Sequence, residues 1–316
     1  MFYQLLKAYA RFAIHLYCTK IVVNKKDLLK INGPVLFAAN HPNSFLDGVI
    51  LSTLLKQNLY SLTRGDVFKN RIAGKILSWL KLLPVYRTSE GTHNLAHNYT
   101  TFDACHEIFK KKQIVLIFSE AGSVNEWHLR PLRKGTARLA FNSWQQGIGV
   151  KIIPLAFNYS SFKKFGKEVH LNFGEVIKKD SFNADTDGKQ LTDFTQQLQL
   201  QLQSLVYEAK DEHSAQKYFP LAKSKLKTAL LLIPGLIGWL VHAPLFYICR
   251  IITEAAFKKS DHFDAVLIAL LFFIYPIYVL LLAIIGSQYY LVLGLILVFV
   301  LPALAWCWLQ VKHLFQ

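Results

Sequence analysis

Two long apolar runs near the end of the chain limit its fold more than any other feature. Residues 265–285 and 290–309 contain no charged side chain, and only four residues separate them. Each run is about 20 residues long, which is the length that an α-helix needs to cross the hydrocarbon core of a bilayer. The sequence therefore predicts a helical hairpin in a membrane, with Trp306 and Trp308 suited to an interface.

An earlier apolar run, residues 228–249, is interrupted by two prolines and two glycines. It either crosses the membrane or enters it and returns on the same side. A re-entrant segment leaves the basic residues that flank the apolar runs on one side, which the positive-inside rule makes cytoplasmic. These residues are Arg250, Lys258, Lys259 and Lys312. We therefore favour a re-entrant segment followed by the hairpin over three full spans.

The charge of the chain is concentrated in its first two thirds. The net charge is +16, and residues 228–316 hold four basic and three acidic side chains, so +15 belongs to residues 1–227. A basic part joined to an apolar tail fits a domain on the anionic cytoplasmic leaflet, or one that handles phosphorylated substrates. Nucleic acid is the competing partner, but no nucleic-acid-binding motif accompanies the charge. We therefore predict an integral membrane protein whose basic domain lies on the cytoplasmic face.

The chain begins with an amphipathic pattern. Polar residues recur at spacings of three and four from Gln4 to His15, and apolar residues cover the other face. We interpret residues 1–30 as a membrane-associating amphipathic segment. A helix packed on the catalytic domain is the alternative, and both can hold. The predicted domains are this segment, a catalytic domain (31–209), a basic linker (210–227) and a membrane region (228–316), the last with a re-entrant segment (228–249) and a hairpin (265–309).

Short β-rich runs alternate with helical patterns between residues 34 and 173. Such alternation predicts an α/β fold, with a sheet flanked by helices. The predicted strands are Val35–Ala39, Leu59–Thr63, Ile114–Phe118, Ile152–Phe157 and Val169–Phe173. Residues 190–209 carry apolar side chains at helical spacing and are predicted to be the last helix of the domain.

His41 and Asp47 are the first candidates for chemistry. His41 follows a predicted strand, and Ser44 is predicted to cap a helix that begins near Phe45. Asp47 then lies in the first turn of that helix, within reach of a histidine in the preceding loop. An imidazole held by a carboxylate can accept a proton from an attacking hydroxyl group. By itself the spacing favours an incidental histidine at a capped helix start.

Four motifs that follow one another along the chain support a functional role for His41 and Asp47. They are Asn40-His41 with Ser44 and Asp47, then Leu83–Arg87, then Phe118–Ser123 followed by Leu129–Ala137, and finally Ile152–Ala156. In this order the chain resembles the glycerolipid acyltransferase family, which contains glycerol-3-phosphate and 1-acylglycerol-3-phosphate acyltransferases. The resemblance covers residues 32–176. Residues 234–238 and 262–264 resemble the branch of this family that has a C-terminal membrane region.

The resemblance implies a role for each motif. His41 and Asp47 would be catalytic, and the acyl group would pass from acyl-CoA or acyl-carrier protein to a hydroxyl of 1-acylglycerol-3-phosphate or glycerol-3-phosphate. Arg87 would hold the acceptor's phosphate, and Glu120 would hold its hydroxyls or order the site. The full set of implied substrate-binding residues is Ser44, Arg87, Glu120, Gly122, Arg133, Lys134 and Pro154.

The same resemblance implies no metal and no cofactor, because a thioester donor is already activated. The four cysteines, which form no CxxC pair, suggest neither a zinc site nor a disulfide framework. The expected partners are therefore membrane lipids and the acyl carrier, without nucleic acid.

Three departures from the family pattern raise alternatives. One extra residue stands between His41 and Ser44, Ser119 replaces a proline, and Ala121 replaces a glycine. If that glycine is needed for a positive φ, Ala121 implies an altered turn. The departures suggest a catalytically inactive lipid-binding scaffold as one alternative. Acylation of another lyso-lipid, such as one with an amino-acid head group, is the other.

Overall fold

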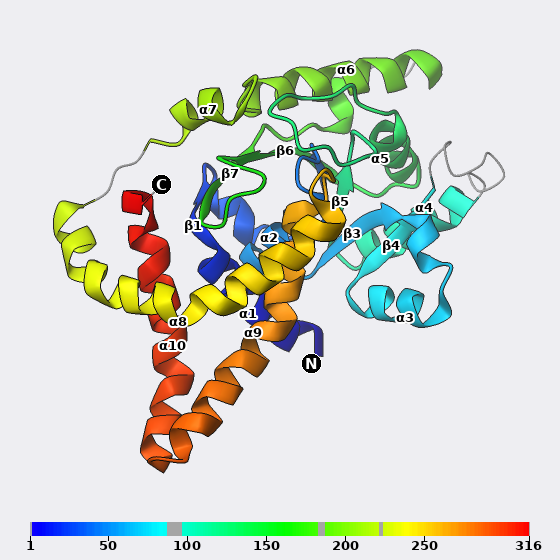
Figure 1. The fold of residues 1–316 in the computed structure, drawn as a ribbon. Coiled ribbons are helices and arrows are strands. Elements are labelled where there is room, and N and C mark those ends of the chain that lie inside the picture. Colours follow the sequence, from blue (N-terminus) through cyan, green and yellow to red (C-terminus); the bar gives the residue numbers. More distant parts are fainter. Residues whose placement is uncertain (1, 87–96, 183–186, 221–223, 316) are drawn as a thin grey trace. The chain divides into compact units, whose positions relative to one another are not determined.

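The structure is a computed structural model that describes residues 2–86, 97–182, 187–220 and 224–315 (Figure 1). The chain packs as two compact units. The first contains Met1–Lys7, Val22–Asn158 and His170–Asp211, and the second contains Ala8–Ile21, Tyr159–Val169 and Glu212–Gln316. Two short segments from earlier in the chain, Ala8–Ile21 and Tyr159–Val169, therefore pack with the C-terminal helices, which the linear domain prediction does not anticipate.

Within the described residues, seven strands form one sheet in the order β1-β7-β6-β2-β5-β3-β4. They are β1 (Cys18–Val23), β2 (Val35–Ala39), β3 (Leu59–Arg64), β4 (Leu82–Val85), β5 (Ile114–Phe118), β6 (Lys151–Tyr159) and β7 (Lys167–Phe173). The strand β2 runs parallel to both of its neighbours, β5 and β6, and β3 runs parallel to β4 and β5. The predicted α/β fold with a sheet flanked by helices is confirmed, and all five predicted strands are present.

Helices of the first unit cover both faces of the sheet. They are the beginning of α1 (Phe2–Tyr17), α2 (Ser44–Leu54), α3 (Arg71–Trp79), α4 (His97–Lys110), α5 (Gly135–Gln145) and α6 (Asp187–Leu205). Buried residues of α4, α5 and α6 share one core with Leu36 and Ala38 of β2. On the other face, Gly48 of α2 lies over Leu116 of β5. Because both faces are covered, β2 is buried along its whole length and is a continuous apolar run.

The N-terminal helix is shorter than the segment predicted for it. It ends at Tyr17, and strand β1 and a 3₁₀ turn (Lys26–Lys30) follow within the predicted residues 1–30. At its beginning, Lys7 Nζ donates to the carbonyl oxygens of Leu55 and Gln57 at 2.7 and 2.8 Å. Only the beginning of the polar face is thus packed on the first unit, because Arg11 and His15 farther along the helix are exposed, as is Phe2 on the other face. Both predicted roles of this helix are compatible with that arrangement.

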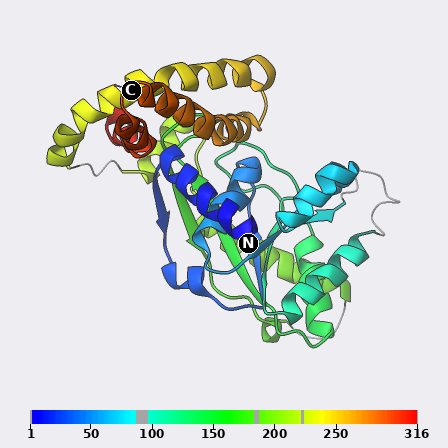
Figure 2. The ribbon, with the colours of Figure 1, turned by 90° about the horizontal axis from the view of Figure 1, so that it is seen from below.

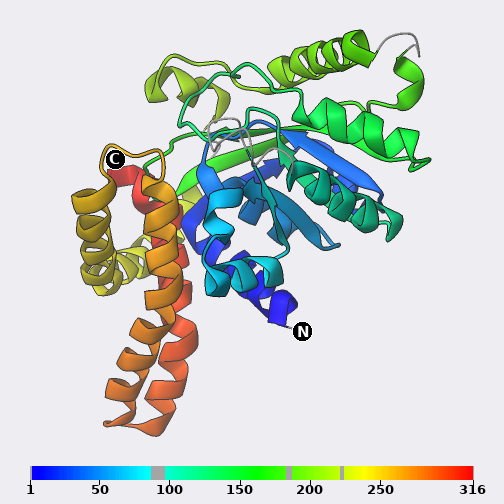
Figure 3. The ribbon, with the colours of Figure 1, turned by 90° about the vertical axis from the view of Figure 1, so that its right-hand side faces the viewer.

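Three long apolar helices dominate the second unit. They are α8 (Lys225–Phe257), α9 (Phe263–Ser287) and α10 (Leu291–Val311), and a short α7 (Glu212–Ala215) precedes them within the predicted linker. By length and composition, Lys225–Phe257, Phe263–Ser287 and Leu291–Phe315 are each able to cross a membrane. Figure 3 shows α9 and α10 side by side as the hairpin that the two uncharged runs predict.

The helix α8 is bent, and both of its ends lie near the same end of the hairpin (Figure 1). At its start, Lys227 Nζ donates to Gln310 near the end of α10 at 3.1 Å. Toward its end, Cys249 packs with Phe263 at the start of α9. Between them, the His242 ring reaches the middle of α9. The prolines and glycines within α8 are the usual cause of such a bend.

A buried ion pair ties three segments of the second unit together. Lys167 Nζ at the start of β7 lies 2.5 Å from Asp264 Oδ2 at the start of α9, and both side chains are fully buried. The Tyr17 hydroxyl at the end of α1 donates to the other carboxylate oxygen. A buried carboxylate needs such partners, because an unpaired charge in the interior is costly.

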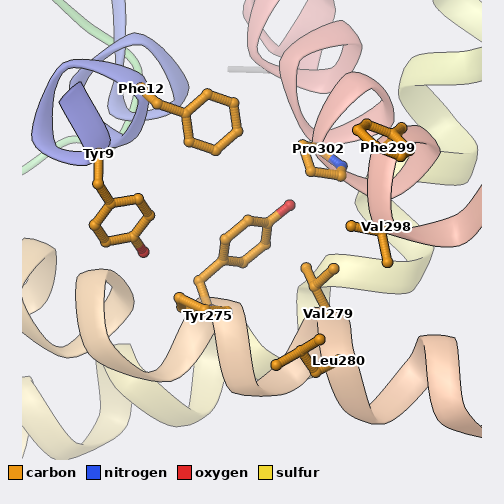
Figure 4. A pocket seen from close by; sticks show the side chains of 9 residues that line it. Tyr9, Phe12, Tyr275, Val279, Leu280, Val298, Phe299 and Pro302 are labelled. Carbon is orange, nitrogen blue, oxygen red and sulfur yellow. The ribbon is translucent and has the colours of Figure 1, made fainter. Parts of the chain in front are cut away.

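An apolar cavity of about 500 Å³ lies between α1, α9 and α10 in the same unit (Figure 4). Its lining is Tyr9, Phe12, Tyr275, Pro276, Val279, Leu280, Val298, Phe299 and Pro302. This lining includes none of the candidate site residues, which belong to the first unit.

Candidate active site

The candidate site forms where β2 and β5 end. Ala39 and Phe118, the last residues of these parallel strands, are paired in register, so the loops that follow leave the sheet side by side. Asn40 fixes the first loop to the neighbouring strand, since its side chain accepts from Phe157 N at 2.8 Å and donates to Phe157 O at 3.1 Å. The loop that begins at Asn40 and the loop that begins at Ser119 therefore lie side by side, although they are far apart in sequence.

His41 and Asp47 meet as predicted. His41 Nδ1 lies 2.9 Å from Asp47 Oδ2, and the Asp47 side chain is fully buried in the first turn of α2. The backbone N–H of Asn43 donates to the same carboxylate oxygen at 3.0 Å. On the other side, the imidazole stacks on the Phe118 ring, with centroids 3.6 Å apart and planes inclined by 12°. The ring is therefore held in both position and orientation.

This geometry selects one tautomer of His41. An ionised carboxylate only accepts hydrogen bonds, so the contact to Asp47 requires a hydrogen on Nδ1. The lone pair then resides on Nε2, at the opposite edge of the ring. That nitrogen is able to accept a proton from a hydroxyl group, and Asp47 stabilises the imidazolium that results.

The predicted cap of α2 is wrong in detail. The helix begins at Ser44 itself, and Asn43 occupies the capping position without a side-chain capping bond. Ser44 has φ +49° and donates its N–H to the Ser123 hydroxyl at 2.6 Å. Ser123 thus satisfies the first amide of the helix from a distant part of the chain, and the Leu46 amide donates to Asn43 O, so these amides do not need a serine cap.

Glu120 holds the loop that carries His41. Its Oε2 accepts from the backbone N–H of His41 at 2.8 Å, and its Oε1 accepts from the backbone N–H of Arg130 at 2.9 Å. The Arg130 guanidinium lies 3.6 Å from the same carboxylate. Burial raises the pKa of Glu120, and the two backbone hydrogen bonds oppose that rise. Of the two roles implied for Glu120, this geometry corresponds to ordering the site.

The turn after β5 keeps a left-handed residue despite the replaced glycine. Ala121 has φ +56°, so the expected alteration of the turn is absent. The carbonyl oxygen of Gly122 accepts from the Arg130 guanidinium, and the buried Ser119 hydroxyl bonds that of Thr136 at 2.9 Å. Both departures are accommodated within the site, which weakens the argument for an inactive scaffold.

A second set of contacts holds the loop that carries the extra residue. Asn125 Nδ2 donates to the carbonyl oxygen of Pro42 at 2.7 Å, and Val124 N donates to that of His41 at 3.3 Å. Together with the Ser44–Ser123 bond, these contacts join residues 41–44 to residues 123–125. The sequence did not point to Ser123 or Asn125, because no local spacing connects loops about 80 positions apart.

The remaining candidates lie in different places. Arg133 donates its backbone N–H to Ser119 O at 2.8 Å and exposes its side chain. Lys134 Nζ donates to Thr192 of α6 at 3.0 Å, and Pro154 is buried in β6, level with Ala38. Arg87 lies outside the described residues. The structure thus brings His41, Ser44, Asp47, Glu120 and Gly122 together. The roles implied for all the candidate residues stay predictions.

Comparisons with known proteins bear on the same region. Residues 20–158 match the family model described as Acyltransferase. Among solved structures, the crystal structure of the 1-acyl-sn-glycerophosphate acyltransferase PlsC from Thermotoga maritima matches at 12% identity and a TM-score of 0.45, over 64% of this chain and 78% of that chain. No curated protein sequence matches significantly. All four ordered motifs and the His41–Asp47 pair lie within the matched residues 20–158, so this part of the chain is similar to an acyltransferase domain.

Proposed function

We propose that the enzyme transfers a fatty acyl group from acyl-CoA or acyl-carrier protein to a hydroxyl of 1-acylglycerol-3-phosphate or glycerol-3-phosphate. The observation that carries this proposal is the contact of 2.9 Å between His41 Nδ1 and the buried Asp47 carboxylate. It leaves Nε2 as the base for an acceptor hydroxyl. The product would enter phospholipid biosynthesis.

The proposed reaction is a direct transfer. The acceptor oxygen attacks the thioester carbonyl while His41 Nε2 takes the hydroxyl proton, so a carbon–oxygen bond forms. The carbon–sulfur bond then breaks, and the departing sulfur receives the proton from the imidazolium. General-base help of this kind is typically worth about 10²- to 10⁴-fold in rate. The proposed transfer needs no metal or organic cofactor, since the thioester is already activated.

A phosphate on the acceptor is supported by the basic character of the catalytic region. Residues 1–227 carry a net charge of +15, and Arg130 and Arg133 belong to the segment beside Glu120. A guanidinium group binds phosphate through two parallel hydrogen bonds. Arg87, at the end of the second motif, is the residue that the family resemblance assigns to this phosphate.

Turnover of the purified full chain in detergent tests the proposal. Each donor is paired with glycerol-3-phosphate or 1-acylglycerol-3-phosphate, and release of free thiol is followed. We expect thiol release that His41→Ala lowers by about 10²- to 10⁴-fold, whereas His15→Ala, at an exposed histidine on α1, leaves it unchanged. Absence of turnover with every pair, or full activity of His41→Ala, contradicts the proposal.

The choice of acceptor needs a separate comparison. If the acceptor carries a phosphate, Arg87→Ala should raise KM for phosphorylated acceptors and leave an unphosphorylated lyso-lipid unaffected. An equal effect on both would favour a lyso-lipid with another head group.

We also propose that the catalytic unit and both ends of α8 share the cytoplasmic side, with the hairpin tip opposite. The support is the bend of α8, whose start contacts Gln310 and whose end packs with Phe263. Both partners belong to the same end of the hairpin. The positive-inside rule makes the end that carries Lys258, Lys259 and Lys312 cytoplasmic.

A further inference from the structure

The helix α3 in the first unit carries its apolar side chains outward. None of its nine residues is buried. Ile72, Ile76 and Trp79 recur at helical spacing and are 73%, 47% and 56% exposed. In a helix that packs on a protein core, such a stripe faces inward. The helix is nevertheless well formed, because the Asn70 side chain caps it by accepting from the amides of Ile72 and Ala73.

The beginning of α1 extends this apolar stripe. The Phe2 ring meets the Trp79 ring edge-on, with centroids 6.4 Å apart. Phe2 and Leu5 are exposed on α1, and Val67 is exposed just before α3. Figure 2 shows α3 and the start of α1 at the near side of the first unit. We call the six residues Phe2, Leu5, Val67, Ile72, Ile76 and Trp79 the α3 surface.

Basic side chains border the α3 surface. Residues 64–81 hold five basic residues and one acidic residue, and that acid, Asp66, is paired with Arg64. Lys69, Arg71 and Lys75 are exposed. Lys75 Nζ lies 5.5 Å from the centre of the Trp79 ring. Tryptophan beside lysine is the side-chain pair that anchors proteins at a membrane interface, and lysine and arginine there attract anionic lipids.

The connection that leads into α3 leaves the sheet at the edge where the active site lies. The strands β2, β5 and β3 are parallel neighbours, so their carboxyl ends share one edge. His41 follows β2, Glu120 follows β5, and the turn Gly65–Phe68 that leads into α3 follows β3. Two strand spacings amount to about 10 Å. Contact of α3 with a lipid surface would therefore hold that surface beside the catalytic edge.

We propose that the α3 surface inserts into the boundary between headgroups and acyl chains of an anionic leaflet. Charge complementarity between the basic border and anionic headgroups supports this occupant. The apolar helices of the same chain support it too, because they keep a bilayer at high effective concentration next to the first unit. The inference concerns where the catalytic unit meets the lipid and does not depend on which acyl transfer it performs.

An acidic partner protein would match the basic border equally well. We favour the lipid surface over an acidic protein for two reasons. Ile72, Ile76 and Trp79 form an exposed apolar ridge, which anionic side chains would not cover. The same chain also carries three helices that are apolar enough to cross a membrane. An amphipathic helix with large apolar residues on one side and lysine or arginine beside them is typical of segments that lie in a membrane interface.

The test uses the full chain in vesicles of phosphatidylcholine and phosphatidylglycerol. Cys307 is first replaced by alanine, because the other three cysteines are buried. A single cysteine labelled with an environment-sensitive nitrobenzoxadiazole (NBD) dye is then introduced by Ile72→Cys, Ile76→Cys or Ser78→Cys. Ser78 is exposed on α3 but lies beyond Lys75, away from the isoleucines, and serves as the matched control.

We expect dye at positions 72 and 76 to emit at shorter wavelength and to be quenched by nitroxide-labelled lipid, and dye at position 78 to do neither. Vesicles without phosphatidylglycerol, or high salt, should weaken the quenching. Equal behaviour at all three positions overturns the proposal. So does shielding at 72 and 76 that appears only when an acidic carrier protein is added. Activity is not part of the readout, so failure of the proposed acyl transfer leaves this test intact.

Discussion

At the scale of single residues, three contacts fix the position and orientation of His41 in the candidate site. Asp47 fixes Nδ1, Phe118 fixes the ring plane, and Glu120 holds the backbone N–H of His41 itself. A base held in this way does not have to be oriented during the reaction, which lowers the entropic part of the barrier.

Asp47→Asn removes the negative charge of this side chain and leaves its size and shape almost unchanged. The amide oxygen still accepts from His41 Nδ1, but no negative charge stabilises the imidazolium. We expect kcat for thiol release to fall by about 10²-fold or more, with KM little changed. Asp103→Asn, at an exposed aspartate of α4, is the control and should behave as wild type. Undiminished turnover of Asp47→Asn would show that the carboxylate has no part in proton transfer.

The raised pKa of Glu120 predicts how stability depends on pH. The folded protein binds this proton more tightly than the unfolded chain does. The resulting stabilisation is fully present below the ordinary pKa of 4.5 and is lost as pH rises through the raised value. Glu120→Gln has no such titration. Wild type should therefore be more stable relative to Glu120→Gln at about pH 4 than at about pH 7.5.

Thermal unfolding of both proteins in one detergent, at both pH values, measures this difference. A stability difference that stays constant, or that grows with rising pH, would contradict a raised pKa.

At the scale of elements, small residues decide how the apolar helices pack. A Cβ on Gly238 of α8 would overlap the carbonyl oxygen of Leu304 in α10. Close approach of backbones at glycine is typical of helices packed within membranes. We expect Gly238→Ala to destabilise the protein by about 1–3 kcal/mol through this overlap.

Gly149→Ala is the matched control, because a Cβ there meets no atom within 4 Å. Thermal unfolding of the two variants in the same detergent checks the prediction. If Gly238→Ala unfolds no earlier than Gly149→Ala, the close contact of α8 and α10 does not exist.

At the scale of the whole molecule, the question is how the apolar helices cross the membrane. With α8 re-entrant, cysteines introduced at Lys217, Lys259 and Leu314 should all react with an impermeant maleimide from the cytoplasmic side. A cysteine at Gln288, in the hairpin turn, should react from the opposite side. Three full spans would instead group position 217 with 288, and 259 with 314. Labelling of sealed vesicles of each orientation separates the two patterns, again in a Cys307→Ala background.

Local pattern was sufficient to predict many of the elements. Val35–Ala39 and Ile114–Phe118 are strands with the bounds that their apolar runs suggest, because a strand covered on both faces must be apolar throughout. The two uncharged runs predicted α9 and α10 for an equally local reason, their length. The edge strands β1 and β4 are absent from the prediction, since β1 contains the polar residues Thr19 and Lys20 and β4 has only four residues.

The sequence by itself determined which residues are candidates for the chemistry and which segments are apolar enough for a membrane, because both depend on residue types at short spacing. Only the tertiary structure decided what holds them. Ser123 and Asn125 secure the His41 loop, and Lys167 pairs with Asp264, through contacts between distant segments. It also turned the apolar stripe of α3 outward. Local sequence patterns do not predict these contacts or the orientation of α3, because both depend on which surfaces meet when the chain folds.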